Sequence, residues 1–163
     1  NLVKVRSLKA EPGAQKEFEG LQRSAKVRLI DAQNTDLSFE GRFDLTYNAA
    51  HALALAAMRW HGYRSENRYL VFQCLPDTLG LSVPEGRVLA KCHERRNLAE
   101  YEGDFDIDEQ LMIDLARISA VLPKKVSELG PVPCTQPPSS RSPGTSATFS
   151  RTTACLLAVT VGS

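Results

Sequence analysis

Apolar residues recur every three or four positions along much of the chain, and this spacing is typical of helices that pack on one side. The first such stripe lies between residues 15 and 31 and consists of Phe18, Leu21, Ala25 and Leu29. No segment of residues 15–125 alternates between apolar and polar positions with a period of two. We therefore expect helices rather than strands.

The longest predicted helix begins after Ser38, whose hydroxyl can cap it, and ends at Gly62. Its apolar residues fall on two faces. One face holds Phe39, Phe43, Tyr47, Ala50, Ala54 and Met58, and the other holds Leu45, Ala49, Ala52, Leu53, Ala56 and Trp60. A helix that is apolar on both faces is usually buried on both, so we expect this one at the centre of the protein.

Three further helices follow in the sequence. Ser65 can cap a helix that runs to about Leu75 and is ended by Pro76. A fourth helix is predicted from Ser82 through roughly Tyr101, ended by a glycine at position 103. A fifth starts near residue 106 and is closed or kinked by a proline at 123, with one apolar face made of Ile107, Leu111, Leu115, Ile118 and Leu122. Together these segments predict an all-α, up-and-down bundle of about five helices.

The chain divides into an N-terminal extension (1–14), a helical bundle (15–128) and a tail (129–163). The tail from residue 131 holds five of the nine prolines and twelve Ser or Thr, with only two charged residues. Because such a composition cannot bury enough apolar area to offset chain entropy, we predict a disordered tail. Three alternatives stay open: a short strand or helix over 154–161, a regulated linker, or an incidental extension.

Charge and hydropathy exclude two classes of protein. The 163 residues carry 20 basic and 19 acidic side chains, a net charge of +1, which excludes a strongly basic nucleic-acid binder. Residues 1–130 hold 18 basic and 19 acidic side chains and are therefore slightly acidic, at −1. No run approaches the roughly 18 apolar residues of a membrane span, and the N-terminus has no apolar signal core. We predict a cytoplasmic protein without membrane contact.

Four widely spaced cysteines, Cys74, Cys92, Cys134 and Cys155, form no Cys-x-x-Cys pair and no Cys/His cluster with zinc-site spacing. We expect no metal, no cofactor and no disulfide framework. Cys74 and Cys92 lie in predicted helices and are expected to be small buried side chains.

The segment 93–102 gathers the side chains with the most chemistry. On a helix, Arg96 and Glu100 lie one turn apart, as do Asn97 and Tyr101. Two interpretations are open. Arg96 can be a structural arginine that bridges helices, or Arg96 and Asn97 can face a cleft and grip a phosphate, for which the planar guanidinium is well suited.

Tyr47 and His51 lie one turn apart on the second predicted helix. They can hydrogen-bond to the Arg96 region across the bundle, or they can satisfy their polar groups at its edge. Three arginines near the junction of the second and third helices indicate either a local basic patch or a solvated charged corner: Arg59, Arg64 and Arg68.

Two segments of the chain occur together in a pattern that a known family shares. Residues 42–57 read Arg-Phe-Asp-Leu-Thr-Tyr-Asn-Ala-Ala-His-Ala-Leu-Ala-Leu-Ala-Ala, with a Gly-Tyr turn at 62–63. Residues 96–101 read Arg-Asn-Leu-Ala-Glu-Tyr. These segments resemble the HEPN family, a group of prokaryotic helical domains that includes partners of nucleotidyltransferases and many RNA-cleaving toxins. The resemblance implies a homodimer, a nucleotidyltransferase or antitoxin partner, and RNA or a nucleotide as ligand.

In the ribonuclease branch of that family, an arginine and a polar residue precede a histidine by four to six intervening positions. Arg96 and Asn97 match the first two, but Tyr101, Glu102 and Gly103 occupy the places of the histidine. A tyrosine, with a pKa near 10, is a poor acid or base at neutral pH. The chain resembles more closely the branches that carry tyrosine here and are not established nucleases.

We therefore predict a HEPN-like interaction or binding module that holds a partner, RNA or a nucleotide without cleaving it. The alternative is a toxin-like, metal-independent ribonuclease with an altered site, in which Arg96 acts with Tyr101 or with His93, three residues before it. The candidate ligand-binding residues are Arg96, Asn97, Glu100, Tyr47 and His51.

Overall fold

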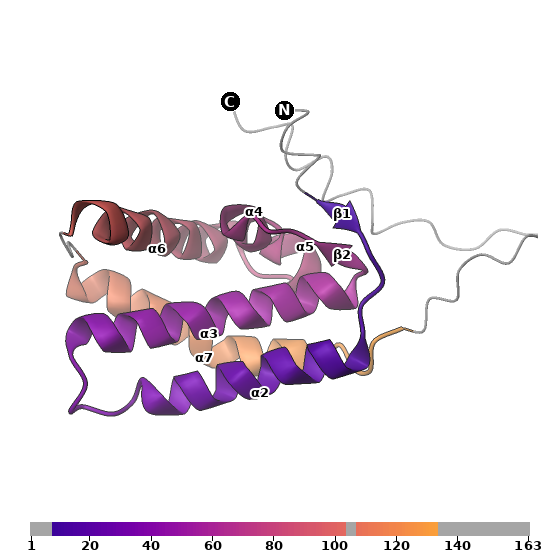
Figure 1. Cartoon of the computed structure of the whole chain (residues 1–163), viewed down its shortest axis with the longest axis horizontal. Coiled ribbons are helices and arrows are strands. Elements are labelled where there is room, and N and C mark those ends of the chain that lie inside the picture. The colour runs from indigo at the N-terminus through magenta and orange to yellow at the C-terminus, as the bar shows by residue number, and fades with distance from the viewer. Residues whose placement is uncertain (1–7, 104–106, 134–163) are drawn as a thin grey trace, which may run out of the picture.

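The computed structural model describes residues 8–103 and 107–133, and within them six helices and two short strands (Figure 1). In chain order these are β1 (Lys9–Ala10), α2 (Gln15–Asp31), α3 (Phe39–Trp60), β2 (Tyr63–Arg64), α4 (Arg68–Gln73), α5 (Leu75–Leu79), α6 (Val83–Glu102) and α7 (Glu109–Ser127). The predicted all-α bundle is confirmed. The predictions for residues 134–163, including Cys134, Cys155 and the segment 154–161, lie outside the described residues.

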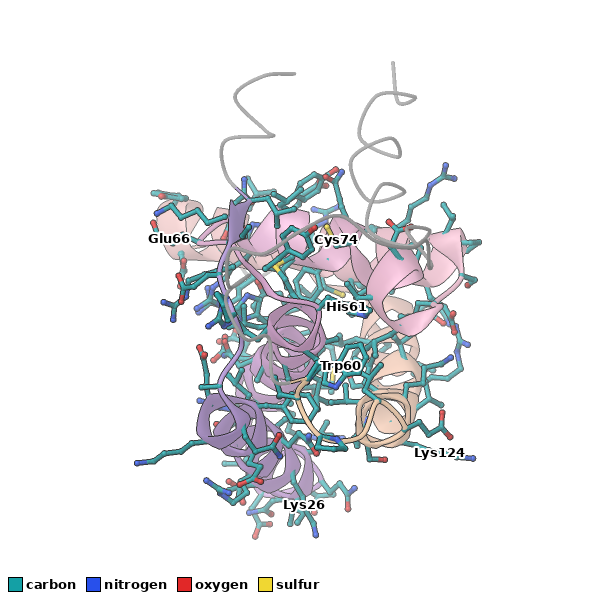
Figure 2. The ribbon with its side chains drawn as sticks, turned by 90° about the vertical axis from the view of Figure 1, so that its right-hand side faces the viewer. Lys26, Trp60, His61, Glu66, Cys74 and Lys124 are labelled. Atoms are coloured by element: carbon teal, nitrogen blue, oxygen red, sulfur yellow. The ribbon has the colours of Figure 1, made fainter. Side chains whose placement is uncertain are left out.

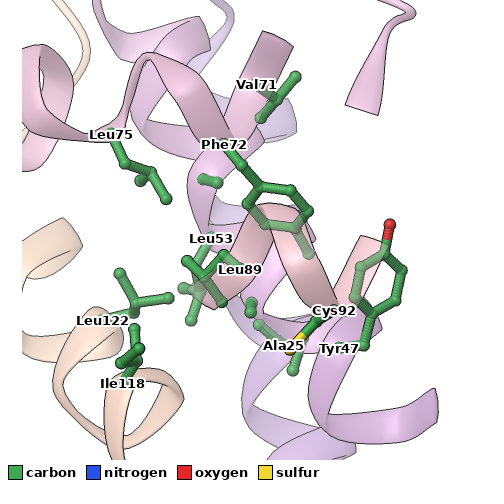
Figure 3. Close-up of a cluster of buried hydrophobic side chains, with 14 of the residues drawn as sticks. Ala25, Tyr47, Leu53, Val71, Phe72, Leu75, Leu89, Cys92, Ile118 and Leu122 are labelled. Atoms are coloured by element: carbon green, nitrogen blue, oxygen red, sulfur yellow. The ribbon is translucent and has the colours of Figure 1, made fainter. Parts of the chain in front are cut away.

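The long helices α2, α3, α6 and α7 run lengthwise in alternating directions, and α4 and α5 lie beside the start of α6, over the last part of α3 (Figure 1). Helix α3 contacts α2, α4, α5, α6 and α7, so it is central, as its two apolar faces predicted. Twelve of its residues are buried. Its alanines, several of them fully buried, leave room for the neighbouring helices to approach closely. Figure 3 shows part of the core that these helices share.

Local signals set the helix ends largely as predicted. The Ser38 hydroxyl accepts a hydrogen bond from the Gly41 amide at the start of α3. Ser82 and Glu85 form a reciprocal capping box at the start of α6, and Gly103 ends that helix with a φ of 69°. Asp108 caps α7 through the Leu111 amide. These caps act within one turn, so sequence alone could locate them.

The structure differs from the sequence predictions around Pro76, and at Pro123 it excludes only the closing of the helix. Asn67, rather than Ser65, caps α4, and that helix ends before Pro76. Pro76 then lies in the first turn of a separate helix, α5, where its missing N–H has no intrahelical partner to lose. Pro123 lies inside α7, which continues to Ser127 instead of closing there.

The junction of the N-terminal segment with the bundle was not anticipated. Lys9 and Ala10 pair antiparallel with Arg64 and Tyr63, a two-residue ladder too short to show a period in the sequence. Arg59, predicted to lie in a basic patch or a solvated corner, is instead buried, with its side chain 3% exposed. We call its surroundings the Arg59 junction.

The Arg59 guanidinium uses all five of its N–H groups in the Arg59 junction. Nε donates to the Glu17 carboxylate at 2.9 Å, and Nη2 donates to the Glu11 carboxylate and the Pro12 carbonyl, each at 3.1 Å. Nη1 donates to the Glu11 and Tyr63 carbonyls. The residue therefore joins β1, α2 and β2 to the end of α3.

The chain returns to this same end after α7. The Trp60 indole N–H donates to the Pro131 carbonyl at 3.1 Å, and the Val132 amide donates to the Gln15 side chain at 2.8 Å. Figure 2 views the molecule from this end, with Trp60 and His61 labelled near the middle. Within the described residues, no helix combines the length and the apolar character needed to cross a bilayer.

Candidate functional site

A cluster of polar side chains lies where α3, α4 and α6 meet. Helix α3 contributes Tyr47, which is fully buried and stacks on Phe43 with ring centroids 6.4 Å apart. In Figure 3 Tyr47 stands at the edge of the core with its hydroxyl pointing away from the apolar side chains. That hydroxyl is 2.8 Å from Nδ1 of His93 on α6. We call this group, with Arg68, Arg96 and their partners, the Tyr47–His93 cluster.

Both ring nitrogens of His93 are hydrogen-bonded. Nδ1 pairs with the Tyr47 hydroxyl, and Nε2 lies 3.1 Å from the Asn97 side-chain amide one turn further along α6. Burial is the main cause that lowers the pKa of His93, and the positive charges of Arg68 and Arg96 add to it. In this state the imidazole is therefore a neutral link between two helices.

Arg96 is held by two carboxylates. Its Nε donates to Asp44 on α3 at 2.8 Å, and its Nη1 donates to Glu100 on α6 at 2.9 Å. The guanidinium carbon also lies 5.4 Å from the centre of the Tyr47 ring, within cation–π range. Burial acts to lower the pKa of Arg96, but the hydrogen bond and charge of Asp44, with Glu100, outweigh it and raise that pKa. Arg96 thus bridges α3 and α6, as one of the two sequence interpretations proposed.

Arg68, at the start of α4, joins the cluster from a third element. Its Nη1 donates to the Asn48 side-chain oxygen at 3.3 Å, and the guanidinium also hydrogen-bonds the Tyr47 hydroxyl. Burial raises the pKa of Tyr47, while the hydrogen bond and charge of Arg68 act in the opposite direction. Arg68 was predicted only as part of a patch or corner with Arg59 and Arg64, and the structure separates it from both.

His51 lies one turn beyond Tyr47 on α3 and packs edge-on against the Phe72 ring, with centroids 5.7 Å apart. Burial, followed by the positive charge of Arg68, lowers its pKa to about 4. The charge of Arg68 in the cluster therefore acts on His51. Among the described residues, His51 forms no hydrogen bond to Arg96.

This low pKa predicts a pH-dependent stability. At pH 7 and above His51 is mostly neutral in both states. As the pH falls from about 6.5 towards 4, the unfolded chain takes up a proton that the folded chain refuses, so stability is lost. We expect the free energy of unfolding to fall by roughly 2 kcal/mol between pH 7 and pH 5 from this group. Urea unfolding at several pH values measures it.

His51→Gln is the matched variant for that measurement, because it keeps a polar side chain that does not titrate. Its stability should change less between pH 7 and pH 5 than that of the wild type. The double variant with His93→Gln should be flatter still, since the pKa of His93 is also lowered. An unchanged slope in His51→Gln would show that other groups cause the pH dependence.

Tyr101 does not join the cluster. Its side chain is exposed on the last turn of α6, with 88% of its surface accessible, whereas Glu100 next to it reaches Arg96. Of the candidates from the sequence, the structure brings together Tyr47, His93, Arg96, Asn97 and Glu100, places His51 beside them, and leaves Tyr101 apart.

The structure adds three residues that sequence reasoning missed: Asp44, Asn48 and Arg68. Asp44 and Asn48 lie one turn apart on α3, and the Asn48 amide donates to both the carbonyl and the carboxylate of Asp44 at 2.8 Å. Asp44 lies three positions before Tyr47 and four before Asn48, a spacing visible in the sequence, because positions three and four apart share a helix face. No local sequence signal placed Arg68 beside Asp44 and Asn48, because the position of Arg68 depends on how α4 packs.

No group of three or more His, Cys, Asp or Glu in the described part of the chain has the arrangement of a metal site. Cys74 and Cys92 are both buried, as predicted. Burial raises the pKa of Cys92 to about 12, so its thiol stays protonated at neutral pH and is a poor nucleophile or metal ligand.

The side chains of the Tyr47–His93 cluster can bind an anion more readily than they can transfer protons. The cluster contains two guanidinium groups, the His93 imidazole and a tyrosine hydroxyl, and the His51 imidazole lies beside it; the pKa values of both imidazoles are lowered. No family model, curated protein or solved structure matches this chain. Its own residues must consequently carry any functional argument.

Proposed function

We propose that this chain is a HEPN-like helical module that holds RNA or a nucleotide at the Tyr47–His93 cluster without cleaving it. The observation that carries the proposal is how two central side chains, His93 and Arg96, are hydrogen-bonded and paired. His93 has both ring nitrogens hydrogen-bonded, and Arg96 is held by two carboxylates. The cluster thus has positive groups that attract phosphate but no free imidazole nitrogen to move a proton.

The resemblance in the sequence supplies the rest of the proposal. We propose that the chain forms a homodimer and pairs with a nucleotidyltransferase or an antitoxin. Sedimentation of the purified protein measures the first point, and a strictly monomeric chain would contradict it. Co-purification with a small nucleotidyltransferase or antitoxin encoded beside it addresses the second.

RNA binding and cleavage can be measured on the same sample. A 5′-fluorescein-labelled single-stranded RNA is incubated with the full chain in EDTA, followed by anisotropy and a denaturing gel. We expect binding with intact RNA, and about tenfold weaker binding for Arg96→Gln, because that change leaves the Asp44 and Glu100 carboxylates without their cation and makes the cluster more negative. If two guanidinium groups contact phosphates, the logarithm of the binding constant should fall with the logarithm of salt concentration with a slope of about −1.4.

Arg23→Gln is the matched control, because Arg23 is an exposed arginine on α2, away from the cluster. It should bind like the wild type. Absence of binding by the wild-type chain would contradict the RNA-binding proposal.

A metal-independent ribonuclease is the second candidate, and the position of His93 favours it. A neutral imidazole between Tyr47 and Asn97 can accept a proton if a substrate displaces the Asn97 amide. Cleavage in EDTA that is abolished by both His93→Gln and Arg96→Ala would establish this activity in place of binding alone.

A further inference from the structure

Arg68 differs from Arg59 and Arg96 in the charge of its partners. Arg59 and Arg96 each pair with two carboxylates. Among the described residues, Arg68 has only neutral partners, the Asn48 amide oxygen and the Tyr47 hydroxyl. It is partly buried, so water screens its charge incompletely. A partly buried cation without a counter-charge is a place where an anion binds favourably.

The positive charge of Arg68 acts on two imidazoles, those of His51 and His93. Arg68 is the largest electrostatic influence on both His51 and His93, and it disfavours their protonated forms. An anion bound at Arg68 would reverse that influence, because a negative charge stabilises a protonated imidazole. The charged and titratable groups that face the two histidines are Asp44, Tyr47, Arg68, Tyr69, Glu94, Arg96 and Glu100.

Among these described neighbours, Arg68 is a cation that no carboxylate pairs with. Asp44 and Glu100 are engaged by Arg96, one on each side of it. Tyr47 is neutral, since burial raises the pKa of its hydroxyl. The Asn48 and Tyr47 groups that hold Arg68 in place carry no charge to compete with a ligand. The cluster therefore has one cation that is already neutralised and one that is not.

We propose that Arg68, with His51 and His93 beside it, binds a phosphate monoester, the group at the end of a nucleotide or a 5′-phosphorylated RNA, and that binding takes up a proton. This rests on the proposed binding function and specifies its ligand. A monoester carries about −1.5 to −2 charges at pH 7, whereas an internal phosphodiester carries one. The larger charge favours an unpaired guanidinium and the protonation of an adjacent imidazole.

Two RNAs of identical sequence separate this inference from the proposed function. One carries a 5′-phosphate and the other a 5′-hydroxyl, and both are titrated into the full chain by calorimetry at pH 7. We expect the phosphorylated RNA to bind about tenfold more tightly. Equal affinity for the two RNAs would overturn the monoester site while leaving RNA binding intact, and no binding of either would contradict both proposals.

Parallel titrations with AMP and with inorganic phosphate identify the source of the group. Binding of both shows that the phosphate alone is recognised, and binding of AMP alone shows that the nucleoside contributes. Repeating the RNA titration in two buffers with different ionisation enthalpies gives the number of protons exchanged. We expect uptake of between half a proton and one proton per site, and no uptake would overturn the role of the histidines.

Arg68→Gln removes the charge while its amide can still reach the neutral partners. It should lose the preference for the 5′-phosphate, whereas Arg117→Gln, an exposed arginine on α7, should keep it. A preference that survives in Arg68→Gln would overturn the assignment. If that variant does not fold, Arg68→Lys keeps a point charge without the planar fork and should show a reduced preference. His51→Gln should keep part of the preference and take up fewer protons.

Discussion

Replacing Arg59 by methionine is expected to lower the free energy of unfolding by roughly 3 kcal/mol, the largest effect that we predict for any side chain outside the apolar core. The methionine can fill much of the volume of the aliphatic stem. It donates none of the five hydrogen bonds of the guanidinium, so the Glu11, Pro12 and Tyr63 carbonyls lose this donor and the Glu11 and Glu17 carboxylates keep, among the described residues, only Arg64. Urea unfolding at pH 7 measures the change.

Arg64→Met is the matched control for this prediction. Arg64 contacts the same two carboxylates, Glu11 and Glu17, at 3.1 and 3.2 Å. Its side chain is 47% exposed, and an exposed ion pair contributes only about 0 to 1 kcal/mol. If the two variants are equally stable, burial of Arg59 is not what holds the N-terminal segment to the bundle.

Gly13→Ala is expected to cost about 2–3 kcal/mol, the second largest effect. A Cβ at this position would lie 2.3 Å from the Arg59 carbonyl oxygen and 3.3 Å from a methyl group of Val132. The oxygen belongs to the backbone of the central helix and cannot move aside as a side chain can. The segment before α2 must therefore shift, which disturbs the hydrogen bonds of Glu11 and Pro12 with Arg59.

Gly20→Ala tests whether that cost comes from the close approach. Gly20 lies inside α2, and a Cβ there would meet only the end of the Arg23 side chain at 3.9 Å. Alanine is a better helix former than glycine, so this variant should gain about 0.5–1 kcal/mol. The same substitution thus has opposite signs at two positions, and the same sign at both would contradict the steric explanation.

The four long helices could be predicted because their signals are local. A stripe such as Phe18, Leu21, Ala25 and Leu29 needs only a partner on one side, and capping residues such as Ser38 bind amides within the next turn. The division of α4 from α5 was missed for the same reason. Pro76 is compatible with ending one helix or starting another, and only packing against α3 and α6 selects the second.

The candidate site could be predicted in part. Its members on α6 follow from helical spacing, since Asn97 lies one turn after His93 and Glu100 one turn after Arg96. Tyr101 shows the limit of that reasoning. It is as close in sequence to Arg96 as the missing histidine would be, yet it lies on the exposed side of the helix.

The sequence by itself determined which segments are helical, where most of them begin and end, and that α3 is buried on both faces. Only the tertiary structure decided which partners the arginines have. Arg59, Arg68 and Arg96 are chemically alike, and no local pattern distinguishes them. What separates them is which carboxylates reach them from segments more than 40 residues away: two for Arg59, one such for Arg96, and none among the described residues for Arg68.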